Sequence, residues 1–90
     1  PLSYYNIAVC NEQLGDDDAA AENYKKAAES KDFSLANHAK FSYGRVLETK
    51  GDYEGAVKAY NELNDKAPDD EWAKIAKTRI LALQIEGKAE

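Results

Sequence analysis

A step of 36 residues relates two stretches of the chain, and this internal repeat constrains the fold more than any other feature. The step places identical residue types onto one another: Gly15 and Gly51, Asp16 and Asp52, Ala20 and Ala56, and Tyr24 and Tyr60. A glycine–aspartate turn followed by small and aromatic residues, recurring with a period of about 20 to 50 residues, indicates stacked supersecondary units. We therefore predict a repeat protein whose stacked units present a continuous surface.

Within each unit, aromatic, aliphatic, small and glycine residues follow one another in a fixed order. In the first unit the order is carried by Tyr4, Ile7, Ala8, Gly15, Ala20, Tyr24 and Ala27. In the second unit it is carried by Tyr43, Gly44, Leu47, Gly51, Ala56, Tyr60 and Pro68. This order resembles the tetratricopeptide repeat (TPR) family. The resemblance implies an all-α fold, a solenoid of helix-turn-helix units that form a superhelix.

Some positions depart from the family pattern. Lys40 stands where the opening aromatic residue of the second unit is expected, Asn11 replaces a tyrosine, and Asp32 replaces the first proline. Two residues are also added between Asp32 and Ala36, which lengthens the family period of about 34 residues. The departures leave the fold assignment intact but do not identify a subfamily.

Apolar spacing and helix-ending residues predict five helices in a single domain. Their approximate bounds are residues 2–14, 16–29, 35–50, 52–66 and 69–85. The units then cover about residues 1–34 and 37–68, followed by a partial third unit or capping helix over 69–90. Since about three repeats are usually needed for stability, we expect a piece of a longer array.

Two packing features are expected from the same periodicity. In the first helix one stripe carries Tyr4, Ile7, Ala8, Asn11 and Leu14, and we expect it to face the core. Ala20 and Ala56 are expected where paired helices approach most closely. Phe33 is expected to fold back from its polar loop as an apolar plug.

Composition excludes several functions. Seventeen acidic and twelve basic residues give a net charge of −5, which disfavours nucleic acid as the main partner. No apolar run approaches the roughly 20 residues that would span a bilayer. The joint around Pro68 resembles the inter-repeat joints of bacterial envelope proteins with these repeats, so the cytoplasm and the bacterial envelope or periplasm both stay open.

Catalytic and metal-binding patterns are also missing from the sequence. One histidine, one cysteine and no glycine-rich phosphate loop give neither a nucleophilic triad nor a nucleotide site. The run from Asp16 to Asp18 lacks the alternate spacing of a calcium loop and suits a helix N-terminus instead. We expect no enzyme activity, no cofactor and no metal, and Cys10 is interpreted as a small, half-buried apolar residue.

In the TPR family the first helix of each unit lines a concave groove that binds protein segments. By that resemblance the groove-lining residues are Tyr5, Val9, Phe41, Arg45, Ile75 and Arg79. The same rows of side chains also hold Glu12, Glu48 and Ala82. One edge of the groove is formed by Leu2, His38 and Trp72. Apolar rings beside two arginines suit a protein or peptide segment with apolar anchors and acidic groups. An equally open interpretation is that the rings only pack neighbouring first helices together. The alternative function is an oligomerisation or spacer segment of a longer array, which includes self-association.

Overall fold

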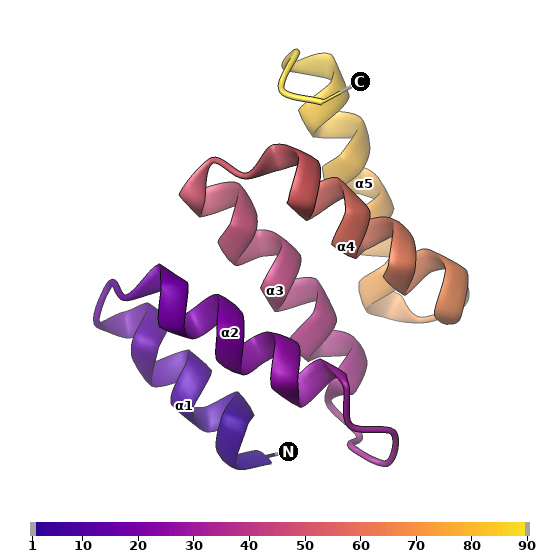
Figure 1. Ribbon diagram of the computed structural model, residues 1–90. Helices are drawn as coiled ribbons and strands as arrows, with labels where there is room; N and C mark the ends of the chain where they lie inside the picture. Colours follow the sequence, from indigo (N-terminus) through magenta and orange to yellow (C-terminus); the bar gives the residue numbers. More distant parts are fainter. Residues whose placement is uncertain (1, 90) are drawn as a thin grey trace.

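A computed structural model describes residues 2–89, which form five helices and no strand. The helices are α1 (Leu2–Gln13), α2 (Asp17–Ala28), α3 (Ala36–Lys50), α4 (Tyr53–Lys66) and α5 (Glu71–Ile85). Each helix packs against the next one in the chain, and α3 also packs against α5 (Figure 1). The bounds lie within two residues of those predicted, so the all-α helical-repeat fold is confirmed.

Equivalent glycine and aspartate residues shape the turns between paired helices. Gly15 and Gly51 have φ angles of 80° and 86°, in the left-handed region that glycine adopts without strain. The next residue, Asp16 or Asp52, then caps the following helix by accepting a hydrogen bond from a backbone N–H three residues later. The Asp16 run therefore starts a helix, as the sequence predicted.

Small residues let the paired helices approach closely, and tyrosine rings fill the space beside them. Ala20 and Ala56 are 0% exposed, which confirms that both are core positions. A Cβ atom added at Gly44 would lie 2.5 Å from Cε1 of Tyr60, so α3 and α4 meet at a site where only glycine fits. The core is thus built from alternating small and large side chains.

The stripe predicted for the first helix is only partly buried. Ala8 is 0% exposed, but Tyr4, Ile7 and Leu14 are 43%, 47% and 83% exposed. The prediction that the whole stripe faces the core is wrong, because α2 covers only the side of α1 on which Ala8 lies. Phe33 does fold back, with its ring centroid 6.0 Å from that of Tyr5.

The five helices form a flat body with extents of 35 × 30 × 15 Å. Among residues 2–89 no helix is long and apolar enough to cross a bilayer.

Candidate functional site

The six residues predicted to line a groove all lie on α1, α3 and α5, the first helices of the successive pairs. Val9 is half-buried on α1, and Ile75 on α5 is 38% exposed. Arg45 and Arg79 are half-buried on α3 and α5. The contacts of Tyr5, Phe41 and the two arginines cross from one first helix to the next.

A cluster of Tyr24, Glu12 and Arg45 joins the first helix pair to α3. Nη2 of Arg45 donates to Oε1 of Glu12 at 2.9 Å, and Nη1 of Arg45 donates to the other carboxylate oxygen. The hydroxyl of Tyr24, on α2, donates to the same Oε1 at 2.9 Å. One carboxylate thus holds α1, α2 and α3 together; we call these residues the first Tyr–Glu–Arg cluster.

The second Tyr–Glu–Arg cluster, Tyr60, Glu48 and Arg79, repeats this arrangement one helix pair later. Nε of Arg79 donates to Oε2 of Glu48 at 3.2 Å, and Nη2 donates to Oε1. The Tyr60 hydroxyl also donates to Glu48. Bidentate arginine–carboxylate pairs fix orientation as well as distance, so the two clusters define how α3 sits on α1 and how α5 sits on α3.

Both clusters shift the pKa values of their members. Hydrogen bonding to Arg45 lowers the pKa of Glu12, although burial opposes the shift. Burial acts to raise the pKa of Glu48, but hydrogen bonds from Arg79 and Tyr60 outweigh burial and lower it. Burial, together with the Glu12 carboxylate, raises the pKa of Tyr24 to about 12. Both carboxylates therefore stay ionised, and the tyrosines stay protonated, at neutral pH.

The arginines are consequently not isolated cations, because Glu12 pairs with Arg45 and Glu48 pairs with Arg79. Each arginine side chain is still 42% exposed. A guanidinium group has five N–H donors, and each pairing uses two of them. Donors remain that can bind a partner's oxygen atoms.

Aromatic rings gather beside the clusters. The Tyr5 hydroxyl lies 2.6 Å from Nδ1 of His38, and the His38 ring centroid lies 4.3 Å from that of Trp72. Phe41 is only 8% exposed and packs against Trp72 at 5.3 Å. Burial and the Arg45 charge lower the pKa of His38, so its ring is neutral at pH 7. For Phe41 these contacts favour the packing interpretation, whereas Tyr5, His38 and Trp72 keep half-exposed surfaces.

The sequence placed His38 and Trp72 only at the edge of the surface and did not predict the arginine–glutamate pairing. A signal was present, since Glu12 and Glu48 are one 36-residue step apart, as are Tyr24 and Tyr60. Their shared offset indicates a repeated contact rather than two unrelated surface charges.

The pKa shifts predict acid sensitivity. Both glutamates have folded-state pKa values below 4.5, so they stabilise the fold above that pH and this contribution is lost as the pH falls through the lowered values. We expect the Tm to fall between about pH 5 and pH 3. The Tm of a variant with Glu12→Gln and Glu48→Gln should fall less over the same pH interval. Thermal melts of both proteins at several pH values measure this, and an equal fall of the Tm in the two proteins would contradict it.

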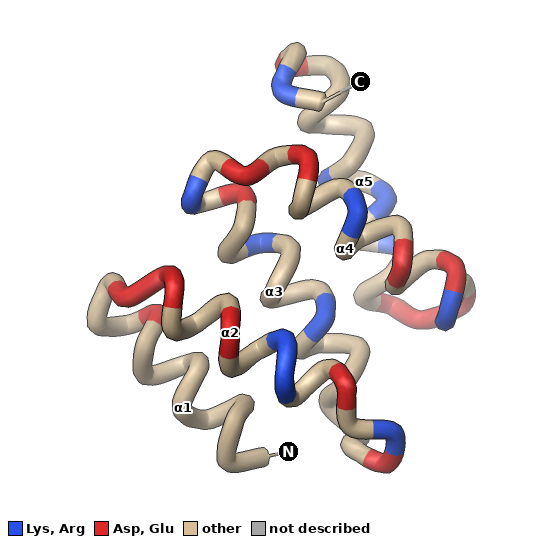
Figure 2. Tube along the Cα trace, viewed as in Figure 1, with Lys and Arg blue, Asp and Glu red and all other residues tan. Residues whose placement is uncertain are grey.

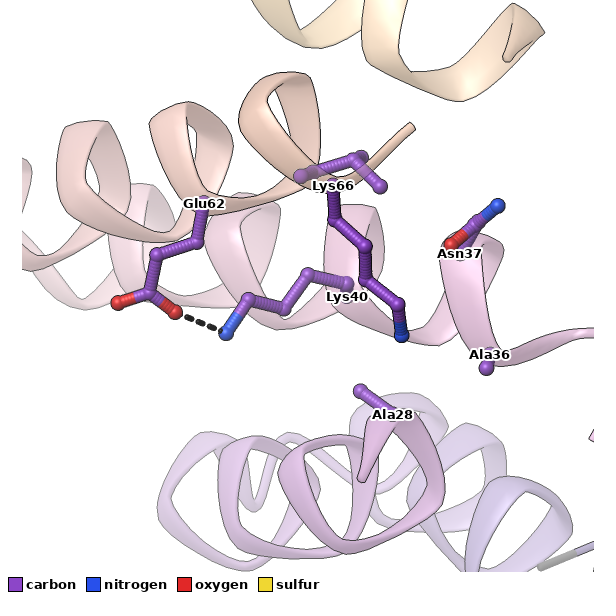
Figure 3. A pocket seen from close by; sticks show the side chains of 7 residues that line it. Ala28, Ala36, Asn37, Lys40, Glu62 and Lys66 are labelled. Carbon is purple, nitrogen blue, oxygen red and sulfur yellow. Dashed lines mark hydrogen bonds and ion pairs between the residues drawn. The ribbon is translucent and has the colours of Figure 1, made fainter. Parts of the chain in front are cut away.

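A separate hollow of about 120 Å³ lies between α2, α3 and α4 (Figure 3). Its lining residues are Ala28, Ala36, Asn37, Lys40, Glu62, Leu63 and Lys66. Nζ of Lys40 is already paired with Glu62 at 2.5 Å. The hollow is smaller than typical small-molecule sites of about 300 to 1,000 Å³. Residues 2–89 also contain no group of three His, Cys, Asp or Glu side chains that could hold a metal ion.

Comparison with known proteins gives a consistent result. Residues 13–71, more than half of the chain, match the family model described as "Tetratricopeptide repeat". A TPR repeat-containing protein of Treponema pallidum (strain Nichols) is 34% identical over 84 residues, which are 93% of this chain and 35% of that protein. The chain therefore spans about a third of its relative's length, and no solved structure matches it. The chain belongs to the tetratricopeptide repeat family, whose members are generally protein–protein interaction modules and typically lack enzymatic activity.

Proposed function

We propose that the chain is a scaffold that binds a protein or peptide segment in a concave groove formed by α1, α3 and α5. In this proposal residues 1–34 and 37–68 are complete units, and residues 69–90 supply a capping or partial third unit. The groove is lined by Tyr5, Val9, Phe41, Arg45, Ile75 and Arg79. Phe41 contributes mainly by holding the neighbouring rings in place.

The observation that carries the proposal is the pair of half-exposed arginines on neighbouring first helices. Glu12 and Glu48 fix each guanidinium group, so little side-chain entropy is lost when a ligand binds. The unused N–H donors suit carbonyl or carboxylate oxygens of an extended segment. The half-exposed rings of Tyr5 and His38 lie beside them and suit apolar anchors.

Binding measurements on arginine variants test this function. The probe is a peptide selected on the intact chain from a random display library and then titrated by calorimetry. Arg45→Ala and Arg79→Ala should each weaken binding about tenfold or more, because a hydrogen bond to a charged group contributes about 1.5 to 3 kcal/mol. Lys58→Ala, on the exposed side of α4, should bind as the wild type does.

The variants must stay folded for this comparison, which thermal melts establish. Arg79→Lys adds a second control, because lysine can keep the charge next to Glu48 but not the bidentate geometry. Equal affinity in the wild type and in both alanine variants would contradict the groove assignment.

A second function, an oligomerisation or spacer segment, is favoured by a different observation. Large apolar side chains are exposed on the two outermost helices: Leu2, Ile7 and Leu14 on or next to α1, and Leu81 and Ile85 on α5. Apolar surface of this kind marks protein contact sites. A molecular mass that rises with concentration in sedimentation experiments would favour self-association over the monomeric binder.

A further inference from the structure

Small side chains leave the hollow of Figure 3 open between α2 and α4. Both helices pack on α3, which lies between them in Figure 1. Ala28 of α2 and Ala36 of α3 line the hollow together with Leu63 of α4. Because the two alanines do not fill the space, the hollow keeps a volume of about 120 Å³ and has partly apolar walls.

The charged side chains around this hollow are mostly basic. Lys40 of α3 and Lys66 of α4 line it, and Glu62 is the one acidic side chain among the described residues of the lining. Figure 3 shows Lys40 running toward Glu62, whereas Lys66 extends from α4 toward α2. Nζ of Lys40 pairs with Glu62, but Lys66 has no ion-pair partner within residues 2–89. The hollow therefore has an excess of positive charge.

A second hollow, of about 270 Å³, adjoins the first. The two share Lys40 and Glu62, and the second adds Lys25 of α2. A hydrogen bond from Lys40 lowers the pKa of Glu62, and the charge of Lys25 adds to this shift, so Lys25 lies near the same carboxylate. The other acidic residue of the second hollow, Asp52, caps α4 by accepting from the Gly55 N–H at 3.0 Å. We call the two hollows together the α2–α4 channel. Figure 2 shows basic residues on each of the three helices that form it.

We propose that the α2–α4 channel binds an acidic segment of a partner protein, with one carboxylate beside Lys66 and Lys40 and a second beside Lys25. The first carboxylate neutralises Lys66, which has no acidic partner of its own. The apolar walls strengthen this attraction, because charges interact more strongly where water is partly excluded. The channel lies between the second helices of the two pairs and uses neither arginine of the proposed groove.

The size of the channel and the charge of the chain favour a short protein segment as the partner. The smaller hollow lies below the volume of most small-molecule sites but suits a group the size of a carboxylate. The adjoining hollow can then take the next part of an extended segment. A nucleic acid carries a charge at every phosphate, and its length would meet the remaining surface of a protein whose net charge is −5.

Glu62 gives the proposal a prediction of opposite sign. Its carboxylate already pairs with Lys40, and its side chain is 49% exposed, so it lies where it repels an incoming anion. Glu62→Gln removes this repulsion and frees Lys40 for the partner. We expect the substitution to tighten binding of an acidic peptide about threefold, as for an exposed ion pair. A gain of affinity cannot arise from unfolding.

The test uses a short fluorescein-labelled peptide in which glutamate alternates with glycine, and fluorescence anisotropy at low ionic strength measures its Kd. Replacing Lys25 and Lys66 together by glutamine should weaken binding about tenfold, because two charge-assisted contacts are lost. The matched control replaces Lys74 and Lys77, two exposed lysines of α5 that line neither hollow, and should leave the Kd nearly unchanged. A peptide with glutamine in place of glutamate should not bind.

Four outcomes would overturn the proposal. Equal losses in the two double variants would show that the peptide responds only to net charge. Unchanged or weaker binding by the Glu62→Gln variant would show that the peptide does not enter the channel. A loss caused by Arg45→Ala would place the peptide in the groove instead. Inorganic phosphate that displaces the peptide as effectively as unlabelled peptide does would identify a site for small anions.

Discussion

Replacing Tyr60 with alanine is expected to lower the free energy of unfolding by about 3 to 5 kcal/mol, the usual range for removing a fully buried aromatic ring. The Tyr60 side chain is 0% exposed, its ring fills the space opposite Gly44, and its centroid lies 5.7 Å from that of Phe41. Its removal leaves a cavity between α3 and α4. The substitution also removes the hydrogen bond that the Tyr60 hydroxyl donates to Glu48. Urea unfolding followed by circular dichroism measures the loss.

Tyr60→Phe separates the ring from the hydroxyl. It should cost less than Tyr60→Ala, about 1.5 to 3 kcal/mol, because only a hydrogen bond to a charged group is lost. A similar cost for the two variants would show that the hydroxyl, and not the packing, holds α4 in place.

The second large effect is expected from Ala56→Leu, which should destabilise the chain by about 1 to 3 kcal/mol through overpacking. Ala56 is 0% exposed on α4, and Ala20 holds the equivalent place on α2. A leucine at either position must push the paired helices apart. Ala20→Leu is therefore expected to behave in the same way, and thermal melts compare the variants.

Lys58→Leu provides the matched control, because Lys58 is exposed on the same helix. It should leave the Tm nearly unchanged, since surface substitutions away from special features usually change stability by less than about 0.5 kcal/mol. If the Ala56→Leu protein had the same Tm as the wild type, α3 and α4 would not be closely packed at this position.

The fold could be predicted from the sequence because each local signal agreed with the repeat. Gly15 and Gly51 end helices, Asp16 and Asp52 start them, and the 36-residue step ties the two turns to one architecture. Agreement between local and global signals is what allows a sequence to specify one structure. The predicted helix bounds therefore differ from the observed bounds by no more than two residues.

The arrangement of the candidate site was harder to predict. Helical periodicity places Arg45 and Glu12 on particular faces but does not show which side chain lies opposite on another helix. The pairing depends on the distance and angle between α1 and α3, which the periodicity within a single helix does not give. Likewise, periodicity marked Ile7 and Leu14 as apolar without showing whether another helix would cover them.

The two Tyr–Glu–Arg clusters also have a consequence for how the chain unfolds. In helical repeats each unit interacts only with its neighbours, so stability is a sum of unit terms and interface terms. Here the same carboxylate contributes to both, because Glu48 accepts from Tyr60 within its own helix pair and from Arg79 of the next helix. When α5 frays, Glu48 loses the charge that balances it while it still binds Tyr60. Fraying at one end is thereby transmitted to the adjacent pair, and a short array unfolds more cooperatively than its thin shape alone would allow.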